Sequence, residues 1–481
     1  MKFKYILVLM TALAFTSCNN WLDVTPQGEV EGEDLLTNEK GYNAALNGIY
    51  YNLTSTTLYG KELSYGMMDV LAQYWDLSSK SKNSYYKQSQ FDYEDASAKS
   101  RFDAIWSAMY QGITQANYIL ESLESNRSSI KYSELIEGEA YALRAFMHME
   151  LAAMYGPVIE KEGDLDQACI SYRTQFNVEA QKFESMRSVL TKAKADLLKA
   201  QDLLKEDPIV GNKRYGDGNT RQVKGLLMRL ELALLNKPGA YEIADELIQL
   251  CKQNELFVLT NREDELYDKN LGEETILGFY KNDLWEVTKE VFGFEKGNQT
   301  DNFCINTNQY SIYLNDLYGR APDGSGTDNR LRFWFGKPSN GGSYYIFSKL
   351  EETSYPGTIR LPYYPEIPIL RLAEVYYVAC ETMIGKDNVK ALGYLNDVRE
   401  SRNLARLNGS YGNDEIMEFL MREMRKDFIG EGRMFMIYKR LYKEFYVKQG
   451  VIIAPTKDKY IFPIPDDEYE FSPNESPKEE K

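Results

Sequence analysis

Apolar residues at helical spacing, each series ended by a strong stop signal, are the feature that most limits what this chain can fold into. One pair of series flanks the turn Asn236-Lys-Pro-Gly239. Its members are Val223, Leu226, Leu230 and Leu234 before the turn, and Tyr241, Ala244, Ile248 and Cys251 after it. Residues three and four apart share one face of an α-helix, whereas proline and glycine end helices. The pattern therefore predicts an antiparallel helical hairpin over residues 220–253.

A second hairpin of similar size is predicted over residues 371–403, with its turn at Gly385-Lys-Asp387. Each hairpin is close to the roughly 34 residues of a tetratricopeptide unit. Further helices are predicted over residues 101–123, 134–155 and 186–204, from the same apolar spacing. Stacked hairpins form a curved scaffold that can hold other segments rigidly. We therefore expect a mostly α fold, a tetratricopeptide-like helical hairpin scaffold.

Two segments do not follow the helical pattern and are rich in aromatic residues. Residues 279–364 hold 18 aromatic residues in 86 positions, about 21%, against 13% in the whole chain. Their many Gly, Asn, Pro and Asp residues indicate turns, which predicts a variable, loop-rich insertion. A smaller cluster lies over residues 59–93, among Ser, Lys, Asn and Gln rather than aliphatic residues. Aromatic residues without aliphatic neighbours are candidates for binding.

The first 17 residues are typical of a signal peptide, because Lys2 and Lys4 precede a short apolar run that ends at Thr16-Ser-Cys18. A cysteine after small residues is the acceptor of lipid in bacterial lipoproteins, so we expect lipidation at Cys18. The chain has a net charge of −16, and of −18 once the two signal lysines are removed. Such a charge repels phosphate backbones and argues against a nucleic-acid partner.

Few residues are suited to metal or nucleophilic chemistry. His148 is the single histidine and lies in an apolar helical stretch, which favours an interior position. Four cysteines remain after Cys18, none of them in a C-x-x-C spacing, and we expect buried free thiols. No metal site, catalytic residue or cofactor is predicted. The four cysteines are Cys169, Cys251, Cys304 and Cys380.

Several separated blocks resemble those of the SusD/RagB outer-membrane nutrient-binding lipoproteins. The blocks are Cys18 with Leu22-Asp23 and Pro26; Trp106-Ser-Ala-Met-Tyr110 with Ala116-Asn-Tyr-Ile-Leu120; Gly138-Glu-Ala140 with Tyr155-Gly-Pro157; Pro368-Ile-Leu-Arg-Leu-Ala-Glu-Val375; Leu395-Asn-Asp-Val-Arg399; Phe428-Ile-Gly-Glu-Gly-Arg433; and Phe462-Pro-Ile-Pro465. The sequence departs from the family after the glutamate-glycine element, Glu431-Gly432. The residues that follow it, Met434-Phe-Met-Ile-Tyr438, indicate a subfamily.

The resemblance implies a SusD-like fold and an outer-membrane location, with the lipid anchor holding the protein on the cell exterior. It also implies a SusC-like TonB-dependent transporter as partner and glycans as ligands. The chain then divides into a signal peptide (1–17), an N-terminal helical region (18–278), a ligand-binding insertion (279–364), and a C-terminal helical region with a tail (365–481). Charged residues of the blocks in or beside apolar helices are expected to form salt bridges of the fold. These are Arg371, Glu374, Arg399, Glu431 and Arg433.

A sugar ring presents an apolar face edged by hydroxyls, so a glycan site combines flat aromatic side chains with hydrogen-bonding groups. Two sets of residues offer this mixture. The first set is Asp69, Tyr74, Trp75, Tyr85 and Tyr86, and the second is Trp285, Trp334, Tyr344 and Tyr345. We predict ligand contacts from these two sets.

Three other functions remain open from the sequence. The same scaffold could bind peptides in place of glycans. A surface glycoside hydrolase needs only two suitably spaced carboxylates, and the chain is rich in Asp and Glu. A protein-interaction scaffold without a small ligand is the third, and it predicts that both aromatic clusters are buried.

Overall fold

The computed structural model describes residues 35–75, 77, 81–204, 220–254, 257–260, 269–292, 303–306, 317–318, 328–336, 344–351, 365–448, 451–470 and 473–474. Cys18 and the signal peptide lie outside these residues. Within the described ranges, no helix combines the length and the apolar character that crossing a membrane requires.

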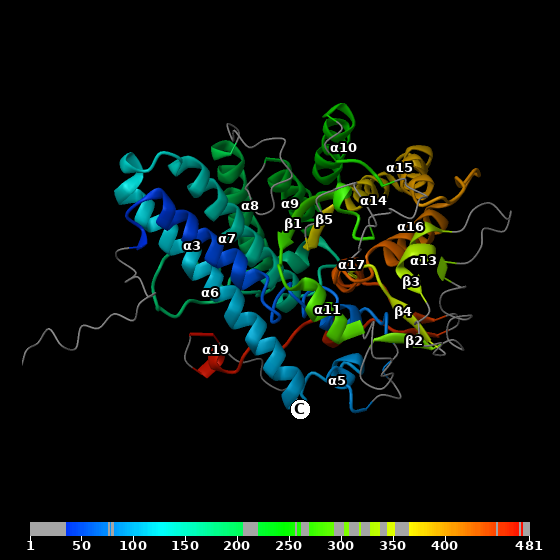
Figure 1. The fold of residues 1–481 in the computed structure, drawn as a ribbon, viewed down its shortest axis with the longest axis horizontal. Helices are drawn as coiled ribbons and strands as arrows, with labels where there is room; N and C mark the ends of the chain where they lie inside the picture. The colour runs from blue at the N-terminus through cyan, green and yellow to red at the C-terminus, as the bar shows by residue number, and fades with distance from the viewer. Residues whose placement is uncertain are drawn as a thin grey trace, which may run out of the picture.

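The N-terminal part of the scaffold consists of long helices packed side by side, at one end of the molecule in Figure 1. They are α3 (Glu39–Leu53), α6 (Ala96–Asn126), α7 (Ser133–Tyr155) and α8 (Met186–Leu203). Asp95 caps α6 and Ser185 caps α8, each accepting a hydrogen bond from a backbone amide of the first turn. The three helices predicted over 101–123, 134–155 and 186–204 are thus confirmed.

Both predicted hairpins are present, and they pack against each other through α10 and α14. The first comprises α9 (Thr220–Ala233) and α10 (Lys237–Asn254), and the second comprises α14 (Leu372–Met383) and α15 (Asn388–Ser401). Gly385 has a φ of 81° after α14, the left-handed conformation in which glycine commonly ends a helix. Helices α16 (Asn413–Asp427) and α17 (Arg433–Leu441) follow them. The mostly α, tetratricopeptide-like fold class is confirmed.

A two-stranded antiparallel ribbon holds the two ends of the insertion side by side. It is formed by β1 (Thr275–Tyr280) and β5 (Glu366–Arg371), with Phe279 opposite Ile367. The amide of Lys281 extends the pairing by donating to the carbonyl of Pro365. Because the ribbon closes the loop at its base, the insertion leaves the helical scaffold and returns to it at one place.

The described parts of the insertion are short elements. They are α11 (Leu284–Phe292), β2 (Cys304–Asn306), α13 (Asn329–Trp334), β3 (Phe335–Gly336) and β4 (Tyr344–Phe347), and the strands form a sheet in the order β2-β4-β3. The other short elements are α4 (Met67–Leu71), α5 (Tyr86–Ser89), η2 (Arg127–Ser129), η3 (Glu162–Asp166), η4 (Gly272–Glu274), β6 (Phe445–Lys448), β7 (Val451–Ile453), α18 (Lys457–Tyr460) and α19 (Asp467–Glu470).

The histidine and the cysteines behave as interior residues. His148 is buried and stacks on Tyr172, with ring centroids 3.8 Å apart. Its Nδ1 lies 2.8 Å from the carbonyl of Arg144, and its Nε2 accepts a hydrogen bond from the amide of Arg173. The thiols of Cys169, Cys251 and Cys380 are buried and unbridged, as predicted, whereas the side chain of Cys304 lies outside the described residues.

Candidate functional site

The two aromatic segments of the sequence meet in the structure. Trp75 stacks on Phe303 of the insertion, with ring centroids 5.5 Å apart and planes inclined by 14°. Phe292 and Phe347 pack on the same indole at 5.6 and 5.7 Å, and Tyr85 adds its ring to Phe303. We call these five residues the aromatic junction. It fixes the insertion against residues 59–93, although the two segments are far apart in the sequence.

A buried carboxylate holds residues 59–93 to the loop after α16. Asp69 accepts hydrogen bonds from the amides of Gly430 and Gly432 at 2.6 and 3.1 Å. Burial raises the pKa of Asp69 to about 8, against the opposing effect of the two amides. Gly432 has a φ of 68°, and a Cβ there would collide with the carbonyl oxygen of Leu63. The glutamate-glycine element of the sequence is therefore a docking point for this segment.

Tyr74 and Tyr85 also make internal contacts. The hydroxyl of Tyr74 donates to the carbonyl of Arg425 at 2.7 Å, and the guanidinium of Arg425 lies 4.5 Å from the Tyr74 ring. The hydroxyl of Tyr85 donates to Glu62 at 3.0 Å, and Arg101 covers its ring. Both tyrosines are buried and use their polar atoms inside the protein.

Trp334, in the insertion, is fully buried. Its indole Nε1 donates to the carbonyl of Lys269 at 2.8 Å, and the ammonium of Lys349 lies 4.3 Å from its ring. A cation over the ring and a satisfied indole N–H stabilise an interior tryptophan. The ring has no face left for a ligand in this structure.

Five of the nine predicted ligand contacts therefore need correction. A side chain with almost no exposed surface cannot touch a ligand, so we assign these five a structural role. They are Asp69, Tyr74, Trp75, Tyr85 and Trp334. Their burial depends on contacts with distant segments, which local sequence does not reveal.

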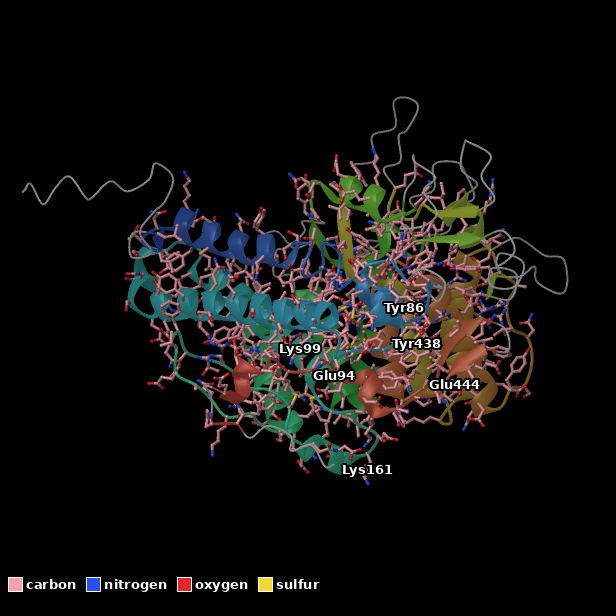
Figure 2. The ribbon with its side chains drawn as sticks, turned by 90° about the horizontal axis from the view of Figure 1, so that it is seen from below. Tyr86, Glu94, Lys99, Lys161, Tyr438 and Glu444 are labelled. Atoms are coloured by element: carbon pink, nitrogen blue, oxygen red, sulfur yellow. The ribbon has the colours of Figure 1, made fainter. Side chains whose placement is uncertain are left out.

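Two predicted contacts remain accessible. Tyr86 begins α5 next to buried Tyr85 and is half-buried; Figure 2 shows it on the lower face of the molecule. Trp285 is half-buried in the first turn of α11, the helix whose last residue, Phe292, belongs to the aromatic junction. The backbones of Tyr344 and Tyr345 form β4, but their side chains lie outside the described residues. Tyr86 and Trp285 thus lie on the two elements that the junction joins.

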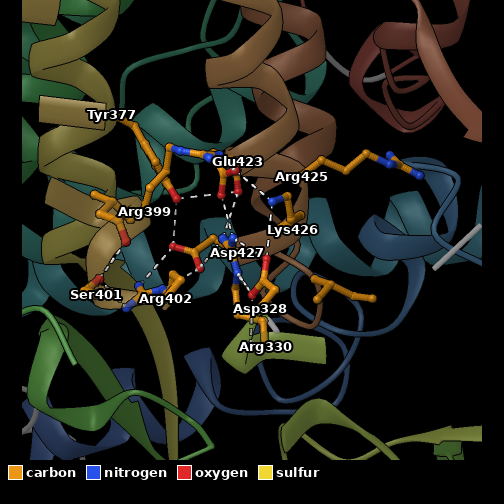
Figure 3. Close-up of polar contacts among 12 residues, drawn as sticks. Asp328, Arg330, Tyr377, Arg399, Ser401, Arg402, Glu423, Arg425, Lys426 and Asp427 are labelled. Carbon is orange, nitrogen blue, oxygen red and sulfur yellow. Dashed lines mark hydrogen bonds and ion pairs between the residues drawn. The ribbon is translucent and has the colours of Figure 1, made fainter. Parts of the chain in front are cut away.

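A buried ionic network fastens the insertion to the scaffold (Figure 3). At its centre, the guanidinium of Arg330 pairs with Asp328 at 2.8 Å, with Glu423 at 2.5 Å and with Asp427 at 3.1 Å. Burial alone would raise the pKa of Glu423, but Lys426, Arg330 and Arg399 outweigh it and lower that pKa below its usual value. Because Asp328 and Arg330 belong to the insertion, the network connects it directly to α16.

The network continues into the ribbon at the base of the insertion. Arg371 pairs with Glu274 at 2.9 Å and with Glu431 at 2.8 Å, and Arg402 pairs with Glu274 at 2.6 Å and Asp427 at 3.1 Å. All of these side chains are buried. Each charge is satisfied by several partners, which is the condition under which buried charges are tolerated.

The predicted salt bridges of the fold are confirmed. Arg371 and Glu431 pair with each other, Glu374 pairs with Arg229 at 2.6 Å, and Arg399 pairs with Glu423 at 2.7 Å. Arg433 lies 3.5 Å from Glu374. Sequence reasoning missed Asp328 and Arg330, which lie in a segment rich in turn signals. Their close spacing on the chain gives no indication that they pair with α16.

Comparisons with known proteins agree with this architecture. Two family models match the chain: one described as starch-binding and associating with outer membrane, over residues 20–213, and one described as SusD family, over residues 357–481. Together they cover about two thirds of the chain. A comparison with curated protein sequences gave no match.

Several solved structures share the fold over nearly the whole chain. A SusD-like carbohydrate binding protein from Bacteroides vulgatus is 20% identical with a TM-score of 0.68, covering 89% of this chain and 95% of its own. A SusD superfamily protein from Bacteroides thetaiotaomicron is 20% identical with a TM-score of 0.67, covering 90% and 98%. A SusD superfamily protein from Bacteroides fragilis is 18% identical with a TM-score of 0.62, covering 91% and 99%.

Proposed function

Because the chain belongs to the SusD/RagB family, we propose that it is a lipid-anchored protein of the cell surface that captures glycans and delivers them to a SusC-like TonB-dependent outer-membrane transporter. The observation that carries the proposal is the match of residues 20–213 to a family described as starch-binding and associating with outer membrane. The protein is proposed to bind its ligand and to catalyse nothing.

The rim of the aromatic junction is the proposed glycan-binding surface. Tyr86 and Trp285 are the two predicted contacts whose described side chains keep exposed surface. An aromatic ring can lie on the apolar face of a sugar ring. The buried rings of the junction and the ionic network would hold the insertion and residues 59–93 in one geometry, which lowers the entropic cost of binding.

The proposed lipid anchor is Cys18, with residues 1–17 as the removed signal peptide. We propose that the transporter contacts the helical scaffold, whereas the ligand contacts the insertion, residues 279–364, together with Tyr86 of the 59–93 segment. This assignment rests on the ribbon of β1 and β5, which brings the two ends of the insertion together at its base.

A ligand panel tests the proposal most broadly. The protein without its signal and anchor, residues 19–481, would be run in affinity electrophoresis gels containing soluble polysaccharides, with peptides tested by calorimetry. Retardation by one or more polysaccharides supports the proposal. If only peptides bind, the proposed ligand would be a peptide rather than a glycan. Release of reducing sugar from a polysaccharide that retards the protein would contradict the non-catalytic role.

A further inference from the structure

Two asparagine-glycine pairs lie in the part of the chain that the structure describes, and the fold places them in different surroundings. Asn47-Gly48 lies inside helix α3, whereas Asn408-Gly409 lies in the loop between α15 and α16. The amide nitrogen after an asparagine can attack the side-chain amide of that asparagine. A following glycine favours this reaction, because it has no side chain to hinder the approach and its backbone adopts many conformations. The freedom of the glycine nitrogen therefore decides which pair reacts.

The loop between α15 and α16 is held on both sides of Asn408-Gly409 but not at the pair itself. On one side, the side chain of Asn396 accepts a hydrogen bond from the amide of Leu407 at 2.8 Å and donates to the carbonyl of that residue at 3.2 Å. On the other side, the side chain of Asn388 donates to the carbonyl of Tyr411 at 3.3 Å. The pair between these points is exposed. Among the described residues, none forms a hydrogen bond with its asparagine side chain or its glycine amide.

The pair in α3 is held along its whole length. Gly48 is an interior residue of the helix, so its amide takes part in the helical hydrogen bonding. The helix is fixed on its neighbour α6, where the side chain of Gln115 donates to the carbonyl of Ala45 at 3.0 Å. Attack by the nitrogen of Gly48 on Asn47 would therefore require α3 to open locally, which costs free energy.

From this contrast, we propose that Asn408 is a site of spontaneous deamidation in the folded protein, whereas Asn47 is protected by its helix. The backbone nitrogen of Gly409 attacks Cγ of Asn408, the bond from Cγ to Nδ2 breaks, and Nδ2 leaves as ammonia with the proton of the attacking nitrogen. Water then opens the succinimide ring at either carbonyl and yields aspartate or isoaspartate. Both products add a negative charge to the loop. Isoaspartate also lengthens the main chain between the two fixed points, Leu407 and Tyr411.

Peptide mapping by mass spectrometry tests the proposal. Residues 19–481 are kept folded in mildly alkaline buffer and sampled over time, and fragment ions assign each deamidated position. A sample taken at time zero measures the deamidation that the digestion itself causes. Deamidation at Asn408 should increase with time, give separate aspartate and isoaspartate peptides, and proceed about tenfold or more faster than at Asn47, because only the reaction in α3 requires local opening.

Two controls separate the effect of the fold from that of the local sequence. In urea, where the protein is unfolded, Asn47 and Asn408 should react at similar rates. Asn408→Gln keeps an exposed amide in the loop but must form a larger ring, so deamidation of this peptide should nearly disappear. Gly409→Ala is unsuitable as a control, because a Cβ there would lie 2.8 Å from Cζ of Tyr411.

Two results would overturn the proposal. One is the absence of time-dependent deamidation at Asn408 in the folded protein. The other is an equal rate at Asn408 and Asn47 in the folded protein, which would show that the helix gives no protection. Circular dichroism confirms that the incubated protein and Asn408→Gln remain folded.

Discussion

Trp75 lies stacked on Phe303, one ring from the segment before α5 and the other from the insertion. Offset stacking of aromatic rings adds about 0.5–1.5 kcal/mol to the burial of their surface. This pair joins two parts of the chain that the sequence separates widely, and it places the insertion relative to the helical scaffold. The two accessible aromatic residues lie on elements that the junction joins: Tyr86 follows Tyr85 in the chain, and Trp285 lies on α11 with Phe292.

Replacing Trp75 by alanine should destabilise the protein by about 3–5 kcal/mol, because it removes a large buried ring from the aromatic junction. Urea unfolding followed by circular dichroism measures the loss. Tyr51→Ala is the control, because Tyr51 is 83% exposed, and its effect should stay within about 0.5 kcal/mol. If Trp75→Ala left stability unchanged but abolished glycan binding, Trp75 would be a ligand contact after all.

Replacing Arg330 by methionine should cost about 3–5 kcal/mol, because Asp328, Glu423 and Asp427 would lose a buried cationic partner. Arg332→Met is the matched control, because Arg332 lies exposed on the same helix, α13. The insertion should also become easier to cleave, which limited proteolysis with mass spectrometry would detect. Equal stability of the two variants would contradict the role of the network.

The pH dependence of stability should contain a contribution from His148. Burial lowers the pKa of His148 to about 3, whereas an unfolded histidine titrates near 6.5. Between these pH values the folded state binds fewer protons than the unfolded state. The contribution of His148 to the free energy of unfolding is therefore complete above pH 6.5. It falls below that pH by up to about 1.4 kcal/mol per pH unit.

Comparison with His148→Asn isolates this effect. The free energy of unfolding of the unmodified protein minus that of the variant should be constant from pH 7 to 8 and should decrease from pH 6.5 to pH 4. Denaturant unfolding at each pH gives both values. A difference that does not change over this range would show that His148 titrates normally in the folded protein.

Replacing Cys18 by serine should release the protein from the membrane fraction, because serine cannot accept the proposed lipid. Fractionation of cells, together with mass spectrometry of the N-terminal peptide, measures the change. Cys251→Ser serves as a control, because Cys251 is a buried thiol within the scaffold. Membrane association that survives Cys18→Ser would require another anchor.

The helical scaffold could be predicted from the sequence because helical periodicity is local. The turn at Asn236-Lys-Pro-Gly239 and the series on either side of it contain the information for the hairpin of α9 and α10. The salt bridge of Arg371 and Glu431 could be predicted for a similar reason, since a charge in or beside an apolar segment needs a partner.

The accessibility of the aromatic residues could not be predicted, because it depends on contacts between distant segments. Trp334 is covered by Lys349 and bonded to Lys269, and neither contact has a signal in the residues around the tryptophan. Trp75 is likewise buried by rings from the insertion. Polar neighbours in the sequence made Trp75 resemble a surface residue, although the fold encloses it.

The most direct test of the central claim is calorimetric titration with a polysaccharide that retards the protein in affinity electrophoresis. It is titrated into the unmodified protein, into Trp285→Ala and into Tyr86→Ala, with Tyr51→Ala as an exposed aromatic control. The account predicts saturable binding that one or both of the first two variants weaken by about tenfold or more, while Tyr51→Ala binds as the unmodified protein does. Binding that is absent, or equal in all four proteins, would contradict a glycan site at the rim of the aromatic junction.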